Sequence, residues 1–111
     1  MDKLTHYKSV LRETILKYAS YKPSVGEVEV EAVIDEEKGH YELMSTGWVN
    51  GNRVHGSVIH LDIRKGKVYV QYDGTNVGIA NELVEAGIPK DDIVLAFKHP
   101  DIRKHTGYAI A

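Results

Sequence analysis

The stretch that decides the fold is EVEVEAVIDEEKGHYELMSTGWVNGNRVHGSVIHLDIRKGKVYVQYD, which occupies residues 27–73. Apolar and polar side chains alternate along much of it, most regularly in residues 27–34, where glutamate alternates with valine and alanine. Successive side chains of a strand point to opposite faces, so a period of two is typical of a β-strand with one buried face. The period returns in residues 41–48, 54–63 and 68–73, and the stretch therefore predicts four strands.

Short polar loops separate these strands and predict an antiparallel meander. Asn50-Gly51-Asn52 is a strong hairpin signal, because asparagine and glycine tolerate a positive φ. Residues 35–39 and 64–67 form the other two turns. These loops imply the cross-strand pairs Ile34 with Tyr41, Leu43 with Ile59, and Ile63 with Val68. A slip of one residue would reverse every side chain, yet these registers agree on one continuous apolar face. Its members are Val30, Ala32, Leu43, Ile59, Leu61, Val70 and Tyr72.

The segments on either side of this stretch predict helices. A first amphipathic helix follows from apolar residues at helical spacing, with Asp2 placed to cap its amides. Its apolar positions are Leu4, Tyr7, Leu11, Ile15 and Tyr18. A second, short helix runs from Ile79 to Ala86, with Thr75 or Asn76 as its cap and Gly87 as its stop.

Two further turns are predicted, at residues 89–92 and 100–104, whereas residues 93–97 fit a strand or a helix equally well. We therefore expect an α+β fold, a four-stranded antiparallel β-meander with helices packed on one face. Residues 1–111 form one domain in this interpretation.

Composition narrows the class of protein. The chain has 111 residues, no cysteine and a formal net charge of -2 at pH 7. The absence of cysteine excludes disulfides and thiolate metal sites, and it fits a reducing cytoplasm. No apolar run approaches the roughly 20 residues that cross a bilayer, and the N-terminus lacks the apolar stretch of a signal peptide. We expect a cytoplasmic protein.

The charge is unevenly spread along the chain. Residues 1–25 carry five basic and two acidic side chains, whereas residues 26–50 carry seven acidic side chains and one basic one. Such an acidic block can attract a basic partner, or it can serve to prevent edge-to-edge pairing of strands. The slightly acidic total argues against a protein that coats nucleic acid phosphates, so any role on DNA is expected to be indirect.

A direct DNA contact through the first helix is the alternative. Its polar side carries four basic residues, Lys3, Lys8, Arg12 and Lys17. Basic side chains along one helix are the usual electrostatic footprint of phosphate binding.

The second face of the predicted sheet carries a polar patch. The registers place His60 opposite Gln71 and Asp62 opposite Tyr69, with Asp73 diagonal to His60. A hydrogen-bonded cross-strand network is the interpretation that we favour, so we expect no catalytic residue, metal or cofactor. Histidine and carboxylates are competent metal ligands, and a small enzyme or metal-binding protein that uses His60, Asp62, Gln71 and Asp73 is a second alternative.

The same second face carries apolar residues that helices on the other side cannot cover. These are Met44, Trp48, Val54 and Val58, with Glu29, Glu31 and Glu42 around them. An exposed apolar patch with a polar rim is typical of an association surface, with Trp48 as its anchor. We expect a sheet-to-sheet homo-oligomer or a contact with another protein. In the alternative, the C-terminal segment folds over the patch.

The sequence resembles the XisI family, the fdxN element excision controlling factor of cyanobacteria. The likeness begins in the opening Asp2-Lys3-Leu4 and ends in the closing Thr106-Gly107-Tyr108-Ala109, so it covers essentially the whole chain. Its most specific parts are VIHLDI (58–63), GKVYVQYDGT (66–75), GIA (78–80), ELV (82–84) and GIPKDDIVLAF (87–97). Where the family commonly has an aromatic residue such as tryptophan, this chain has Tyr69, a conservative departure.

The resemblance implies a role in the site-specific excision of a DNA element during heterocyst development. It further implies a XisH-like partner protein and a separate recombinase. The family has no established catalytic residues to carry over, so a non-catalytic regulatory subunit is expected, with DNA touched through the partner.

Overall fold

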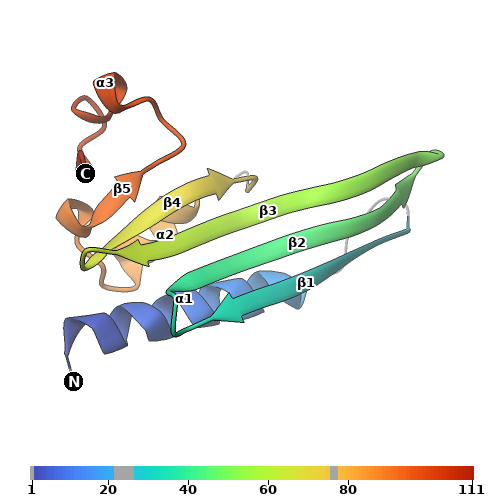
Figure 1. Ribbon diagram of the computed structural model, residues 1–111, viewed down its shortest axis with the longest axis horizontal. Helices are drawn as coiled ribbons and strands as arrows, with labels where there is room; N and C mark the ends of the chain where they lie inside the picture. Colours follow the sequence, from blue (N-terminus) through green and yellow to red (C-terminus); the bar gives the residue numbers. More distant parts are fainter. Residues whose placement is uncertain (1, 22–26, 76–77) are drawn as a thin grey trace.

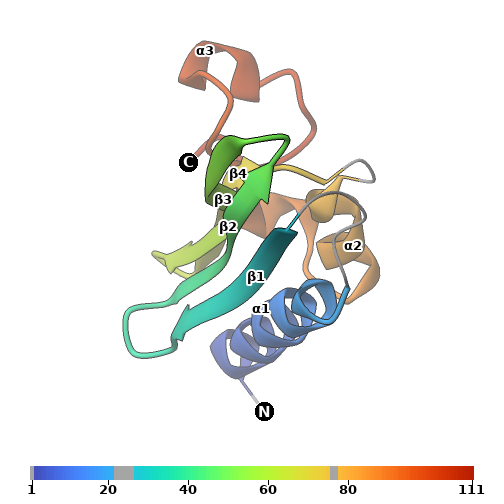
Figure 2. The same cartoon turned by 90° about the vertical axis from the view of Figure 1, so that its right-hand side faces the viewer.

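The computed structural model describes residues 2–21, 27–75 and 78–111, which form one mixed sheet with the helices of residues 3–19 and 79–85 against one of its faces (Figures 1 and 2). This is the α+β architecture that the sequence predicts. In chain order the elements are α1 (Lys3–Ala19), β1 (Glu27–Asp35), β2 (His40–Val49), β3 (Asn52–Arg64), β4 (Lys67–Asp73), α2 (Ile79–Glu85), the 3-10 helix η1 (Lys90–Asp92), β5 (Ile93–Leu95) and α3 (Pro100–Arg103).

Strands β1 to β4 form the predicted antiparallel meander, and the three predicted cross-strand pairs are all present. The two tighter hairpins turn through residues with positive φ, Asn50 (51°) with Gly51 (79°) and Lys65 (54°) with Gly66 (75°). Two successive residues with positive φ match the right-handed twist of the flanking strands. The turn chemistry therefore sets both registers.

The sheet has five strands, one more than the sequence predicts. Residues 93–97, which periodicity could not assign, begin with β5, and β5 pairs in parallel with β4. Parallel neighbours need a crossover, and α2 with η1 supplies it. All three residues of β5 are buried, so the strand shows no alternation that could separate it from a buried helix.

The predicted face is wrong for two residues of β4, Tyr72 and Asp73, because the strand contains a β-bulge. The pairing shifts from Leu61 with Val70 to His60 with Tyr72, which leaves Gln71 as the extra residue. Beyond a bulge the side chains change faces. Tyr72 is therefore 49% exposed instead of joining the apolar face. Asp73 turns toward the helices, where it accepts a hydrogen bond from the backbone of Ile79.

A second bulge lies in β3. The pairing shifts from Leu43 with Ile59 to Met44 with Ser57, so Val58 is the extra residue. Val58 packs against the core instead of lying beside Met44 on the second face. Val54 pairs with Gly47 beyond this bulge, on the same side as Leu43.

The core lies between the sheet and helices α1 and α2, which lie on the same side of it (Figure 2). Helix α1 begins as predicted, since the Asp2 side chain accepts a hydrogen bond from the backbone of Thr5 at 2.8 Å. Its apolar stripe is buried at Tyr7, Leu11 and Ile15 and partly buried at Tyr18, whereas Leu4 is 44% exposed. The fully buried side chains include Leu11, Ile15, Tyr41, Leu43, Ile59, Leu61, Ile79, Leu83, Ile88 and Ile93.

The start of α2 departs from the prediction. Thr75 does not cap the helix, and Asn76 lies outside the described residues. Asp73 takes this role, because its Oδ2 accepts from the Ile79 amide at 2.8 Å while its Oδ1 accepts from the Thr75 amide at 2.9 Å. The helix ends as predicted before Gly87, whose φ is +103°.

Asp92 joins η1 to α1, and this link predicts a pH-dependent contribution to stability. Tyr7 donates a hydrogen bond to Asp92, and Lys3 pairs with the same carboxylate oxygen at 2.8 Å. Burial acts to raise the pKa of Asp92, but the hydrogen bonds from Lys3 and Tyr7 outweigh it and lower the pKa. A carboxyl whose pKa is lowered by folding stabilises the fold above its unfolded pKa, and this stabilisation is lost as the pH falls through the folded pKa.

Replacing Tyr7 with phenylalanine should therefore cost about 1–2 kcal/mol at neutral pH, since it removes a hydrogen bond to a charged group. The penalty should shrink as the pH falls through the lowered pKa of Asp92, below its ordinary value of about 4, because the carboxylate that accepts the hydrogen bond is then protonated. Urea unfolding of Tyr7→Phe and the parent chain at neutral and acid pH measures it. A penalty that is the same at both pH values contradicts the role of Asp92.

Candidate functional site

The face of the sheet opposite α1 and α2 is the candidate site, and we call it the outer face. Cross-strand pairing places on it Glu29, Glu31 and Val33 of β1, His40, Glu42, Met44, Thr46 and Trp48 of β2, Arg53, His55, Ser57, His60 and Asp62 of β3, and Tyr69 and Tyr72 of β4. It holds a polar group and an apolar group of side chains, and the two adjoin at Val33 and Tyr72, which pair across strands with Glu42 and His60.

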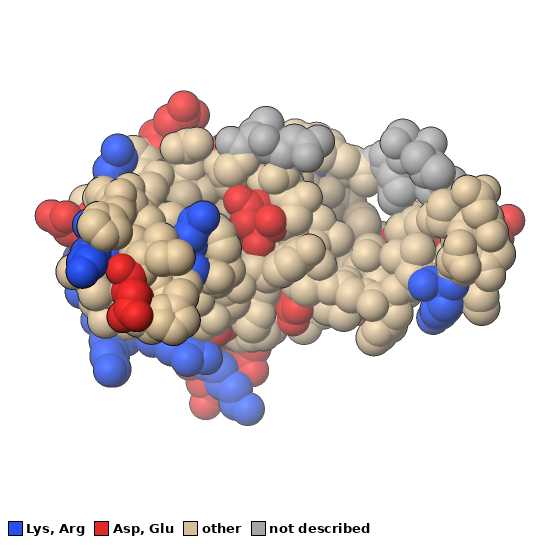
Figure 3. Space-filling view, turned by 90° about the horizontal axis from the view of Figure 1, so that it is seen from above, with Lys and Arg blue, Asp and Glu red and all other residues tan. Residues whose placement is uncertain are grey.

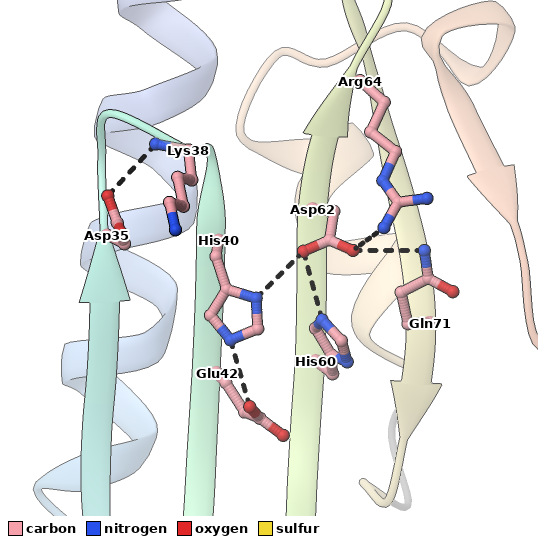
Figure 4. A network of polar contacts seen from close by, with 8 residues as sticks. All are labelled: Asp35, Lys38, His40, Glu42, His60, Asp62, Arg64 and Gln71. Atoms are coloured by element: carbon pink, nitrogen blue, oxygen red, sulfur yellow. Dashed lines mark hydrogen bonds and ion pairs between the residues drawn. The ribbon is translucent and has the colours of Figure 1, made fainter.

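The polar group centres on Asp62, and we call it the Asp62 cluster: His40, Glu42, His60, Asp62, Arg64 and Gln71 (Figure 4). Asp62 is the one charged residue among the buried side chains of the described chain, at 5% exposure. Its Oδ1 lies 3.2 Å from Nδ1 of His40 and 3.1 Å from Nε2 of His60. Its Oδ2 accepts from Arg64 at 3.1 Å and from Gln71 at 3.2 Å.

Strand pairing explains why these side chains meet. His40 is the cross-strand partner of Asp62, and Glu42 is the partner of His60. His60, Asp62 and Arg64 lie on the same side of β3 because they are two residues apart. The bulge in β4 presents Gln71 to the second carboxylate oxygen. Four side chains thus satisfy a buried carboxylate, as burial of a charge requires.

The structure brings together His60, Asp62 and Gln71 of the predicted polar patch, and it places Tyr69 opposite Asp62 as predicted. It does not bring Asp73 to the patch, because the bulge turns that residue to the helix side. His40 was not predicted for the patch, and Glu42 was predicted on this face only as part of the rim of the apolar residues. The predicted register already implied the position of His40, because continuing the pairing of Leu43 with Ile59 by three residues places His40 opposite Asp62.

The Asp62 cluster lies in an open depression of about 400 Å³, which is also lined by Val33, Asp35 and Lys38. The rings of His40 and His60 have their centroids 4.6 Å apart. Nε2 of His40 lies 3.1 Å from a carboxylate oxygen of Glu42. The cluster therefore offers donors, acceptors and imidazole nitrogens at a surface that solvent reaches.

The apolar group differs from the predicted association surface. Met44 and Trp48 lie on the outer face as predicted, with Trp48 half exposed and its ring 5.3 Å from the Arg53 guanidinium. Val54 and Val58 do not share this face, because the bulge in β3 turns both side chains to the opposite side of the sheet. Two exposed apolar residues of the outer face, Val33 (39% exposed) and Tyr72 (49% exposed), were not predicted for the association surface.

The C-terminal segment does not cover Trp48. It lies beside β5, whereas Trp48 stands near the end of β2 at the far tip of the β2–β3 hairpin (Figure 1). The outer face around Trp48 is thus open in the single chain.

The basic residues of α1 are largely neutralised by ion pairs. Lys3 pairs with Asp92 at 2.8 Å, Arg12 with Glu36 at 3.3 Å, and Lys17 with Glu82 at 2.9 Å. Only Lys8, of the four residues predicted for DNA contact, is absent from the ion pairs found among the described residues. On the side of the molecule away from α1, which Figure 3 shows, Lys and Arg side chains are likewise interspersed with Asp and Glu.

No helix within the described ranges is long and apolar enough to cross a membrane.

Comparison with known proteins places the chain among XisI proteins. The model of the family described as XisI protein matches residues 1–110. A crystal structure of a XisI-like protein from Anabaena variabilis is 39% identical, with a TM-score of 0.90 over 97% of this chain and 99% of that chain. The crystal structure of the fdxN element excision controlling factor XisI from Anabaena variabilis is also 39% identical, with a TM-score of 0.83 over 99% of this chain and 100% of that chain. No curated protein matches.

Proposed function

The chain belongs to the XisI family, and we propose that it is a non-catalytic controlling factor for site-specific excision of the fdxN element during cyanobacterial heterocyst development. The observation that carries this proposal is the match, over the full length of both chains, to an fdxN element excision controlling factor. The protein acts in the cytoplasm in this proposal, in keeping with a chain that has no cysteine.

The controlling factor acts by protein association, with a XisH-like protein and a recombinase as partners and with a second copy of itself. The support is the apolar group of the outer face, which is spread along the sheet. Trp48 is half exposed near the tip of the β2–β3 hairpin, whereas Val33 (39% exposed) and Tyr72 (half exposed) lie beside the Asp62 cluster. Tryptophan and tyrosine are the residues that most often dominate binding energy at protein interfaces. Acidic side chains of β1 flank the group and favour a basic partner surface.

Direct DNA binding through α1 has weaker support. Three of its four basic residues already pair with carboxylates, so they bring little net charge to a phosphate. Catalysis at the Asp62 cluster also has weaker support, because the depression around it is open and active sites usually exclude water.

Replacing Trp48 with glutamate should weaken association by at least about 30-fold, since a buried interface tryptophan commonly contributes about 2 kcal/mol or more. The chain should stay folded, because Trp48 is half exposed in the single molecule. Sedimentation measures self-association, and capture on an immobilised XisH-like protein measures partner binding.

Leu16→Glu is the matched control for this change. Leu16 is 45% exposed and lies on α1, in the layer behind the sheet, so the same charge is added away from the outer face. It should leave association intact. Equal association by Trp48→Glu and the parent chain would remove the outer face from the proposal.

The role in excision is tested with a reporter plasmid that carries the ends of the fdxN element. The plasmid is placed in a cell with the recombinase, a XisH-like protein and this chain, and the joined product is amplified across the new junction. Excision that requires this chain supports the proposal. Excision that proceeds equally without it contradicts the controlling role, whatever the outcome for association.

A further inference from the structure

Three potential metal ligands converge in the Asp62 cluster, from two neighbouring strands. They are Nδ1 of His40, Nε2 of His60 and Oδ1 of Asp62, and all lie within 4.8 Å of one another. The two nitrogens lie 3.2 Å and 3.1 Å from the shared oxygen. Figure 4 shows His40 reaching from β2 toward Asp62, and His60 lying over β3 with Nε2 toward the same carboxylate oxygen.

These separations match those in a coordination shell. Two ligand atoms of a tetrahedral ion are about 3.3 Å apart when each is about 2.0 Å from the metal. Both nitrogen-to-oxygen distances in the cluster fall close to that value. The strands therefore hold each histidine nitrogen at about the distance from the Asp62 oxygen that a shared ion would give, and all three ligand atoms within 4.8 Å of one another.

Neighbouring side chains orient two of the three ligands, His40 and Asp62. Glu42 lies 3.1 Å from Nε2 of His40, so when an ion displaces the proton on Nδ1, Glu42 accepts a hydrogen bond from the proton that stays on Nε2. Arg64 and Gln71 both engage Oδ2 of Asp62 and leave Oδ1 toward the histidines. A carboxylate behind a ligating histidine is a common arrangement in metal sites.

The charge balance is compatible with a cation. Glu42 and Asp62 contribute two negative charges against one positive charge from Arg64, and both imidazoles are neutral when they coordinate. The Arg64 side chain is 63% exposed, so solvent screens its charge, whereas Asp62 is buried. The ion would replace the imidazole protons that otherwise join both histidines to Asp62.

We propose that His40, His60 and Asp62 form a site for a first-row divalent transition metal, with Zn²⁺ as the best-suited ion. Two imidazoles with one carboxylate favour such ions over Mg²⁺ and Ca²⁺, which prefer oxygen ligands alone. Three protein ligands leave a fourth position for water or an anionic group. That position faces the open depression, which Lys38 also lines. The site is independent of the role in excision.

Isothermal titration of the tag-free chain with ZnCl₂ at neutral pH tests the proposal. One ion per chain should bind with a Kd of about 10 µM or tighter. His60→Ala and Asp62→Asn should each weaken binding by at least about 100-fold, and Glu42→Gln by about 10-fold. Excess Mg²⁺ should not compete. His55→Ala is the matched control, since His55 lies on the same face of β3 outside the cluster and should leave the Kd unchanged.

A measurement on the unaltered chain keeps the test valid if a variant fails to fold. Histidine ¹⁵N spectra should show Zn²⁺-induced shifts at Nδ1 of His40 and Nε2 of His60, with the other histidines unaffected. The proposal is overturned if millimolar Zn²⁺ does not bind to the parent chain. It is equally overturned if binding survives in both His60→Ala and Asp62→Asn, or if the shifts occur at other histidines.

Discussion

Gly47→Ala is expected to destabilise the chain by at least about 3 kcal/mol, the largest effect of any single methyl group that we anticipate. A Cβ at this position would lie 2.0 Å from the carbonyl oxygen of Glu27 and 2.7 Å from Cα of Val28. Both atoms belong to the backbone of β1, so no side-chain rotation can relieve the overlap. The φ of Gly47 is also +152°, which alanine rarely adopts. β1 must therefore move away from β2 at this point.

Urea unfolding with the denaturant slope measured for both proteins quantifies this effect. Gly56→Ala is the matched control, because Gly56 lies in β3 of the same hairpin and a Cβ there would meet nothing within 4 Å. It should change the free energy of unfolding by less than about 0.5 kcal/mol. Similar losses in the two variants would mean that close approach of β1 is not what requires glycine at position 47.

Asp73→Ala is expected to cost about 2–3 kcal/mol, the second largest effect. The carboxylate accepts from the Thr75 amide and hydroxyl at 2.9 Å and 2.6 Å and from the Ile79 amide at 2.8 Å. Without it, the first amide of α2 loses its partner in a partly buried setting. Because Ile79 is fully buried, any loosening of this turn also disturbs the core.

Asp73→Asn separates the two halves of this interaction. An amide side chain has one oxygen, which can accept from Ile79 or from Thr75 but not from both. Its cost should be about half that of the alanine variant, and hydrogen exchange at the Ile79 amide reports which contact survives. A loss within about 0.5 kcal/mol for Asp73→Ala would show that water replaces the carboxylate at little cost.

The turns of the meander could be predicted because their chemistry is local. Asn50-Gly51 needs nothing beyond its own residues to adopt two positive φ values, and the alternation on either side then determines the pairing. The helix cap at Asp2 was predictable for the same reason. These features persist in the structure because tertiary contacts agree with them.

The two bulges could not be predicted from the same pattern. An extra residue at Val58 or Gln71 leaves the sequence on both sides alternating, so the change of face is invisible to a period of two. Each bulge places part of a predicted site on the other face of the sheet. The bulge in β3 removes Val54 and Val58 from the predicted apolar surface, and the bulge in β4 removes Asp73 from the predicted polar patch. Strand β5 escaped prediction because its three residues are buried on both faces.

The Asp62 cluster was half predictable. His60 and Asp62 follow from the alternation in β3, whereas His40 lies 22 residues from Asp62 and meets it only through the pairing of β2 with β3. The predicted register already contained that pair.

The parallel pairing of β5 with β4 makes completion of the sheet depend on residues 93–95, which follow all the other strands in the chain. The hairpins of β1 to β4 involve neighbouring segments and can form as soon as they leave the ribosome. The edge of β4 stays unpaired until residues 93–95 have been synthesised. The bridge between Val94 and Ala109 can form only after Ala109 has been added. A chain cut short before Ile93 therefore exposes a row of unpaired amides and carbonyls on β4, which are a template for aggregation of incomplete products.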